Sequence, residues 1–161
     1  MKLTKRHIIY ILITLGLMVF IFVQSALPAD LSQNESNFLV PFFVKVFHVL
    51  PDTASFIIRK SAHFLEYTAL GLILTLTVRS LWFSASEAKN GNVSSRAEVL
   101  SAILSFVIGA LYAATDEFHQ MFVNGRSGEL RDWSIDAGGV LLGVLIICLI
   151  QGIRKKRRTS V

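Results

Sequence analysis

Four long apolar stretches limit what this chain can fold into. They run from about residue 8 to 23, 62 to 82, 99 to 115 and 133 to 152. A helix needs roughly 20 mainly apolar residues to cross the hydrocarbon of a bilayer, where backbone polar groups find no water. Only 17% of the residues are charged, which is too few for an ordinary water-soluble domain. The sequence therefore predicts an all-α integral membrane protein, with four transmembrane helices bundled in a single domain over residues 1–161.

The first apolar stretch has two interpretations. A basic flank precedes its short apolar core, as in a secretory signal peptide, and the small residues Ser25, Ala26 and Ala29 follow it as weak cleavage candidates. However, the sequence around Ser25 is a poor match to the usual small-x-small pattern. We therefore expect this stretch to be retained as the first membrane helix.

Charged residues are divided unevenly between the two sides that four crossings define. One side has both termini, the connector 83–98 and Arg79 near the end of the second crossing, with 11 basic and two acidic residues. The other side has five basic and nine acidic residues. Because basic residues accumulate on the cytoplasmic side of a membrane, we expect a multi-pass protein of the cell membrane with both termini in the cytoplasm. The net charge of +5 then describes orientation and does not indicate a nucleic-acid partner.

The segments outside the crossings suit the membrane surface. The outer segment 24–60 contains a phenylalanine-rich stretch, 38–50, which is short for a crossing and is expected to form an interfacial helix. The basic tail 153–161 follows the fourth crossing, where it would meet anionic lipid headgroups. Membrane lipids are thus expected partners.

The fourth crossing also contains small residues that indicate helix packing. Gly139 and Gly143 have the GxxxG spacing, which lets a second helix approach closely. Cys148 is the single cysteine of the chain, so an internal disulfide and a cysteine-cluster metal site are both excluded.

Ionisable side chains stand at the start of the second crossing. Such groups are energetically expensive against a membrane helix and by default indicate a functional site. Residues three and four apart share one helical face. The residues on this face are Arg59, Lys60, His63, Glu66 and Tyr67. Taken alone, the group also fits an internal His–Glu pair flanked by cations at the headgroups.

A second polar group follows the third crossing and continues through a turn into the fourth. Its candidate site residues are Asp116, Glu117, Gln120, Arg126, Arg131, Asp132 and Asp136. A solvated loop with a helix cap is the plainer interpretation, since aspartate suits a cap. The topology, however, brings both polar groups to the same outer level of the bundle. We therefore expect one outward-facing site. The sequence does not decide whether His119 belongs to this site.

Three motifs in these groups resemble the VanZ-like family of small bacterial membrane proteins. The motifs read RKxxHFxEY from Arg59, TDExHQxF from Thr115 and GRxGxxxDxxxDxxG from Gly125. The residues after the first crossing, near Ser25, are similar to a short polar motif of that family only loosely. The family takes its name from a protein linked to low-level resistance to the glycopeptide teicoplanin. The resemblance implies a role in the cell envelope and an outward-facing polar site.

Our first functional hypothesis is that the site binds, and in an enzymatic form transforms, a lipid-linked anionic molecule such as a cell-wall precursor or a polyprenyl-phosphate-linked molecule. Arginine side chains suit phosphate and carboxylate groups. Glu66, Asp116 or Glu117 would act as acid and base, and His63 would carry a proton. Tyr67, Gln120 and the cations would bind the substrate. No cofactor is indicated.

Three other hypotheses use the same residues. A non-enzymatic protein would keep the charges as ion pairs and alter antibiotic access through partner or headgroup binding. A metal site would use the His63–Glu66 and Asp116–His119 spacings, but the neighbouring cations oppose a divalent ion. Ion transport is disfavoured because no chain of acidic residues continues to the inner side.

Overall fold

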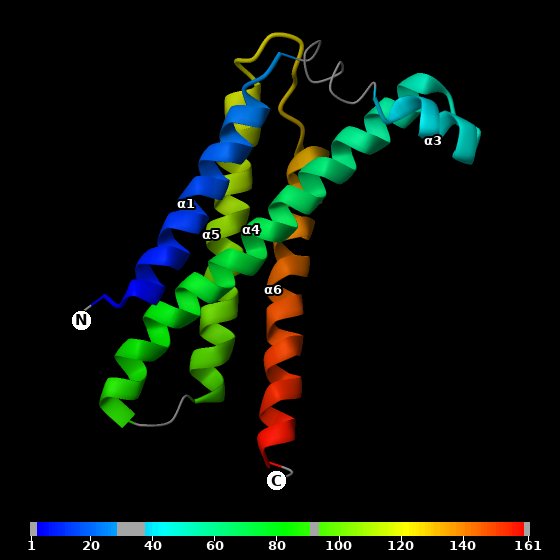
Figure 1. The fold of residues 1–161 in the computed structure, drawn as a ribbon. Helices are drawn as coiled ribbons and strands as arrows, with labels where there is room; N and C mark the ends of the chain where they lie inside the picture. The colour runs from blue at the N-terminus through cyan, green and yellow to red at the C-terminus, as the bar shows by residue number, and fades with distance from the viewer. Residues whose placement is uncertain (1–2, 29–37, 91–93, 160–161) are drawn as a thin grey trace.

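The computed structural model describes residues 3–28, 38–90 and 94–159, and in these ranges it contains helices and no strands (Figure 1). The helices are α1 (Lys5–Ser25), α3 (Val40–Phe47), α4 (Pro51–Asn90), α5 (Ser95–Gln120) and α6 (Leu130–Thr159). Of these, α1, α4, α5 and α6 are long and apolar enough to cross a membrane. Each of the four stretches expected to cross falls inside one of them. Residues 29–37 of the outer segment and the last two residues of the basic tail lie outside the described ranges.

The helices extend further than the apolar stretches. α4 begins at Pro51, well before the expected crossing, because proline suits a first helical position and Asp52 in the first turn interacts favourably with the helix dipole. The same helix continues to Asn90 into the expected connector, and Ser94 caps the start of α5 by accepting a hydrogen bond from the Ala97 N–H at 3.2 Å. α3 lies within the stretch expected to be interfacial and ends at Phe47, followed by the cap residue His48, whose backbone is left-handed with φ 52°.

The close contact of α4 with α6 depends on glycine. A Cβ atom at Gly139 would lie 2.5 Å from the Phe64 carbonyl oxygen, and one at Gly143 would lie 2.6 Å from the Leu72 nitrogen. Both neighbours are backbone atoms, which cannot move aside as a side chain can. The helix packing indicated by the GxxxG spacing is therefore present, and α4 and α6 form the most extensive helix pair.

α1 is held in the bundle by polar contacts with two helices. The Thr14 and Thr77 hydroxyl groups are hydrogen-bonded at 2.9 Å between α1 and α4. The Tyr112 hydroxyl on α5 donates to the Met18 carbonyl at 2.6 Å. Ile21 of α1 is fully buried in the core. This core is made by Ile21, Tyr67, Leu70, Leu74, Ala113, Val140 and Val144.

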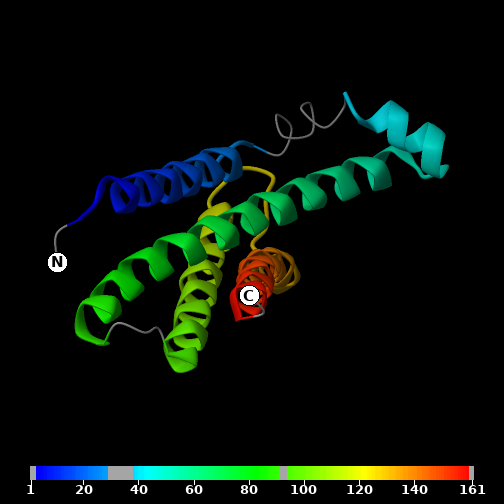
Figure 2. The same cartoon turned by 60° about the horizontal axis from the view of Figure 1, so that its bottom comes forward.

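Successive long helices run in opposite directions. The start of α1 and the end of α6 lie toward the same end of the bundle, and the loop between α5 and α6 lies at the other end (Figure 1). α4 crosses the others obliquely and extends past them to α3 (Figure 2). The side of the membrane on which each end lies stays a prediction.

Candidate functional site

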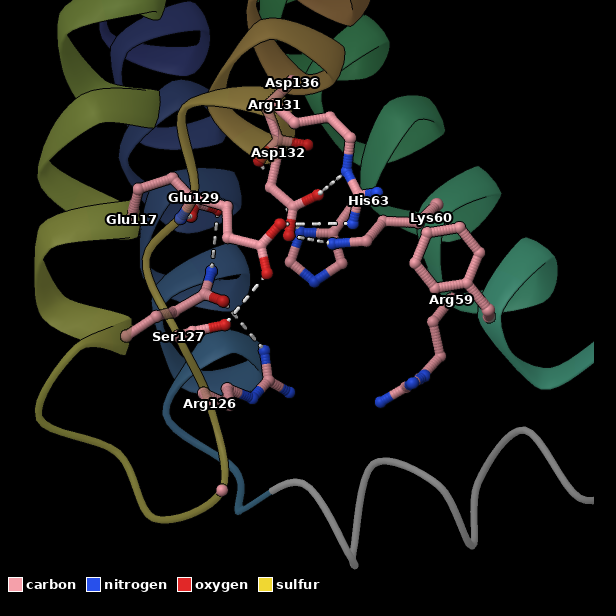
Figure 3. A pocket seen from close by; sticks show the side chains of 13 residues that line it. Arg59, Lys60, His63, Glu117, Arg126, Ser127, Glu129, Arg131, Asp132 and Asp136 are labelled. Carbon is pink, nitrogen blue, oxygen red and sulfur yellow. Dashed lines mark hydrogen bonds and ion pairs between the residues drawn. The ribbon is translucent and has the colours of Figure 1, made fainter. Parts of the chain in front are cut away.

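A polar cavity of about 180 Å³ lies between the first part of α4, the end of α5, the α5–α6 loop and the start of α6 (Figure 3). Most of the site residues expected from the sequence line it. These are Arg59, Lys60, His63, Glu117, Gln120, Arg126, Arg131, Asp132 and Asp136. The structure thus brings the two polar groups of the sequence together in one place.

Ion pairs connect α4 with α6 across this cavity. The Lys60 ammonium contacts the Asp132 carboxylate, and the His63 Nδ1 atom lies 3.9 Å from an Asp136 oxygen. Arg131 lies 3.6 Å from the other Asp132 oxygen and 3.2 Å from the Glu129 carboxylate. One carboxylate, that of Asp132, therefore faces two cations.

Glu117 is held by hydrogen bonds that come from the loop and from its own helix. The backbone N–H of Glu129 donates to Glu117 Oε2 at 3.1 Å, and the Gln120 amide donates to Glu117 Oε1 at 3.4 Å. The Ser127 hydroxyl donates to the Glu129 carboxylate at 3.1 Å, which supports the same loop. Glu117 is consequently fixed in orientation, with its carboxylate at the wall of the cavity.

Asp116 points to α1 and does not line the cavity. Its carboxylate is 1% exposed and accepts hydrogen bonds from the Ser25 hydroxyl at 2.5 Å and from the Gln120 amide at 3.2 Å. Gln120 in turn accepts from Arg126 at 3.4 Å. A continuous polar network thus connects the end of α1 with the cavity.

Of the three arginines that line the cavity, Arg126 and Arg59 form no ion pair with a carboxylate of the described residues. Arg126 donates to the backbone oxygens of Leu27 at 2.9 Å and Gln24 at 3.5 Å, both of which are neutral. The buried Nε atom of Arg59 has no hydrogen-bond acceptor in the described part of the chain. Burial lowers the pKa of the Arg126 guanidinium from its usual value and is the largest cause of the shift. The positive charge of Arg59 lowers this pKa further. Both groups lie on the same side of the cavity (Figure 3).

A comparison with protein families identifies the family of this chain. The model of the VanZ/LLP1 family matches residues 8–151, which include every predicted site residue. The chain belongs to the VanZ/LLP1 family. No curated protein and no solved structure matches it.

Besides Asp116, two of the predicted site residues lie outside the cavity lining, Tyr67 and Glu66. Tyr67 is fully buried in the core, with its hydroxyl in electrostatic range of the Asp116 and Asp136 carboxylates. Glu66 is half-buried and does not line the cavity. His119, which the sequence left open, packs against the Phe22 ring with 4.4 Å between ring centroids.

The side chains proposed for metal binding have different neighbours. His63 faces Asp136, whereas His119 packs on a phenylalanine of α1. Within residues 3–28, 38–90 and 94–159, no group of three or more metal-ligating side chains comes together.

Four residues that line or support this VanZ/LLP1 site were not predicted from the sequence as site residues. Phe56 lies 5.7 Å from the Lys60 ammonium and 5.4 Å from the Arg131 guanidinium, and so supports both cations with its ring. Ser127 and Glu129 hold the loop, and Ser25 holds Asp116. Helical spacing from Lys60 back to Phe56 could have revealed the first of these. The role of Ser25 depends on a contact between distant segments.

Proposed function

We propose that the cavity binds the phosphate or carboxylate group of a lipid-linked envelope molecule. The observation that carries the proposal is the pair of guanidinium groups, Arg59 and Arg126, that face one cavity without a carboxylate partner among the described residues. An anion between them would supply the missing charge, and the planar donors of arginine suit a phosphate or carboxylate.

An apolar groove beside the cavity supports a lipid-linked ligand. The groove has a volume of about 450 Å³ and shares Phe56 and Lys60 with the cavity. It continues between α4 and α6 past Phe64, Leu65 and Ile135. A molecule with its anionic group between Arg59 and Arg126 and its chain along this groove would contact both the cavity and the groove.

The charge distribution supports placing the cavity on the outer face of the cell membrane, with both termini in the cytoplasm. The end of the bundle opposite the cavity has most of the basic residues, including the tail from Arg154 to Arg158. An outer cavity would meet lipid-linked cell-wall precursors. Together with the VanZ-like motifs, this favours a contribution to glycopeptide (teicoplanin) resistance.

If the ligand is also transformed, Glu117 and His63 are the side chains that would exchange a proton. Both line the cavity, where the Glu129 N–H orients Glu117 and the His63 Nδ1 atom lies 3.9 Å from an Asp136 oxygen. Glu66 and Asp116 are less suited to this role, because neither lines the cavity.

Arg59→Gln is expected to weaken binding of a polyprenyl monophosphate by about 10-fold to 100-fold, because a hydrogen bond to a charged group contributes about 1.5–3 kcal/mol. The measurement is a titration of the purified protein in nanodiscs with the monophosphate and with the matching polyprenol. The uncharged alcohol should bind weakly to both proteins. Arg96→Gln removes an exposed arginine at the other end of the bundle and serves as the control. Equal binding of the phosphate to all three proteins would contradict the proposal.

A second candidate function is supported by the ion pairs themselves. Lys60, Asp132 and Arg131 form a continuous cluster that joins α4 to α6. In a non-enzymatic protein this cluster would hold the outer surface in shape for a partner or a headgroup. Envelope lipids and precursors of cells with and without the protein distinguish the two functions. An enzyme must change the amount or structure of a lipid, whereas a binding protein changes teicoplanin susceptibility alone.

A further inference from the structure

A second charged cluster lies at the end of the bundle opposite the cavity. Arg79 of α4 is 9% exposed, and its guanidinium lies 3.8 Å from the Glu98 carboxylate and 4.4 Å from the centre of the Phe83 ring. Lys155 of α6 lies 3.8 Å from the other Glu98 oxygen. None of these residues takes part in the outer cavity.

A crevice of about 280 Å³ adjoins this cluster between α5 and α6. Its walls are apolar or small, because Ala102 and Ile103 of α5 face Cys148 and Gly152 of α6. Ile103 is 53% exposed, so the crevice opens to the surroundings of the bundle. We call this space, with Arg79, Glu98 and Lys155 at its polar end, the inner crevice.

The helix length places the inner crevice at the second surface of a bilayer. From Asp136 in the outer cavity to Lys155, α6 rises by about 28 Å at 1.5 Å per residue. The hydrocarbon of a bilayer is about 30 Å thick. When the outer cavity lies at one headgroup layer, Lys155 lies at the other, and the apolar walls of the crevice lie at the level of the acyl chains.

We propose that the inner crevice binds one anionic glycerophospholipid, with its phosphate beside Glu98 in contact with Arg79 and Lys155, and with an acyl chain between α5 and α6. The lining contains two cations and one carboxylate, so the single charge of a phosphodiester complements it. The buried guanidinium lies in a low-dielectric place, where its attraction to phosphate is strong. The small residues leave the space that a chain requires.

Lys155→Gln is expected to lower the affinity for phosphatidylglycerol about fivefold, as one lysine near a headgroup contributes about that factor. Gly152→Leu should abolish the bound lipid, because its side chain would enter open space and fill the crevice. The full chain is purified, depleted of lipid and titrated with phosphatidylglycerol or phosphatidylcholine, and bound lipids are counted by native mass spectrometry. Wild-type protein should retain one phosphatidylglycerol in preference to phosphatidylcholine.

Matched controls separate the crevice from general attraction to the basic tail. Arg154→Gln removes an exposed tail charge beside Lys155, and Gly16→Leu adds a side chain to open space on α1. Neither should change the bound lipid. If Arg154→Gln weakens binding as much as Lys155→Gln does, or if both lipids bind equally, the proposal is wrong.

Alkylation of the Cys148 thiol gives an independent measure of whether a lipid occupies the inner crevice. It lines the crevice and is the single cysteine of the chain, so its alkylation by a small maleimide reports on this space alone. In nanodiscs, phosphatidylglycerol should slow the alkylation relative to phosphatidylcholine, and Lys155→Gln should remove the difference. Equal rates in both lipids for the wild-type protein would overturn the proposal. No outer-cavity residue is altered in either experiment, so the result is separate from the proposed function.

Discussion

Gly143→Leu is expected to force α4 away from α6 and to lower the free energy of unfolding by about 3 kcal/mol or more. At this position a Cβ atom would already lie 2.6 Å from the Leu72 nitrogen, and a leucine adds three further carbon atoms. The colliding atoms belong to the backbone, so the helices themselves must move. Since α4 and α6 form the two walls that meet at the Lys60–Asp132 pair, the polar cavity should be lost with the packing.

Unfolding of the purified protein in mixed detergent micelles measures this effect. Gly16→Leu is the matched control, because a Cβ atom at Gly16 meets nothing within 4 Å. The control should unfold as the wild-type protein does. A Gly143→Leu protein as stable as the control would mean that α4 and α6 do not pack through their backbones.

Asp116→Ala is expected to be the most damaging change among the buried polar groups, at about 3 kcal/mol. The substitution leaves the Ser25 hydroxyl and the Gln120 amide without their shared acceptor in a buried place. Ser25→Ala removes one donor and should cost about 1–2 kcal/mol. Because the two side chains form one hydrogen bond between α1 and α5, the double variant should be less damaged than the sum of the two, by about 1–2 kcal/mol.

The same unfolding measurement on both single variants and the double variant gives this coupling energy. Thr115→Ala is a suitable control, since Thr115 is exposed and its hydroxyl donates to the Tyr112 carbonyl of its own helix. Strict additivity of Asp116→Ala and Ser25→Ala would show that the two residues act independently and that α1 is held by other contacts.

The elements of the fold could be predicted because each depends on local composition. Long apolar runs predict membrane helices wherever they occur, and glycines four apart predict a close helix contact. The charged residues could also be assigned to one site. Successive membrane helices run in opposite directions, so the starts of the second and fourth crossings and the end of the third lie at the same end of the bundle. Nine of the predicted side chains line the cavity for this reason.

The finer arrangement could not be predicted, because a helical face is broader than a cavity. Lys60, His63 and Tyr67 share a face, yet Tyr67 is two turns deeper than Lys60 and ends in the core. Asp116 and Glu117 are adjacent in sequence but point to different neighbours, Asp116 to Ser25 of α1 and Glu117 to the loop. Which of the two faces the cavity depends on how α1 packs, and no local pattern contains that information.

The pairing of the charged side chains could not be predicted from the sequence either. A count of acids and bases gives the outer side a negative balance, which would argue against an anion site. In the structure, Asp132 faces two cations, whereas Arg59 and Arg126 face no carboxylate of the described chain. The local excess of positive charge at Arg59 and Arg126 therefore comes from how the charged side chains pair in the folded chain.

One contact in α4 has a mechanical consequence for the whole molecule. Gly71 lies midway in sequence between His63, at the outer cavity, and Arg79, at the inner crevice, and a Cβ atom there would lie 3.0 Å from the Cα atom of Val140. α4 is continuous through this point, and α6 also contacts the α4 backbone at Phe64 and Leu72, so the two helices are in contact along several residues. A shift of α4 against α6 along this contact would therefore change the walls of the cavity and of the inner crevice together.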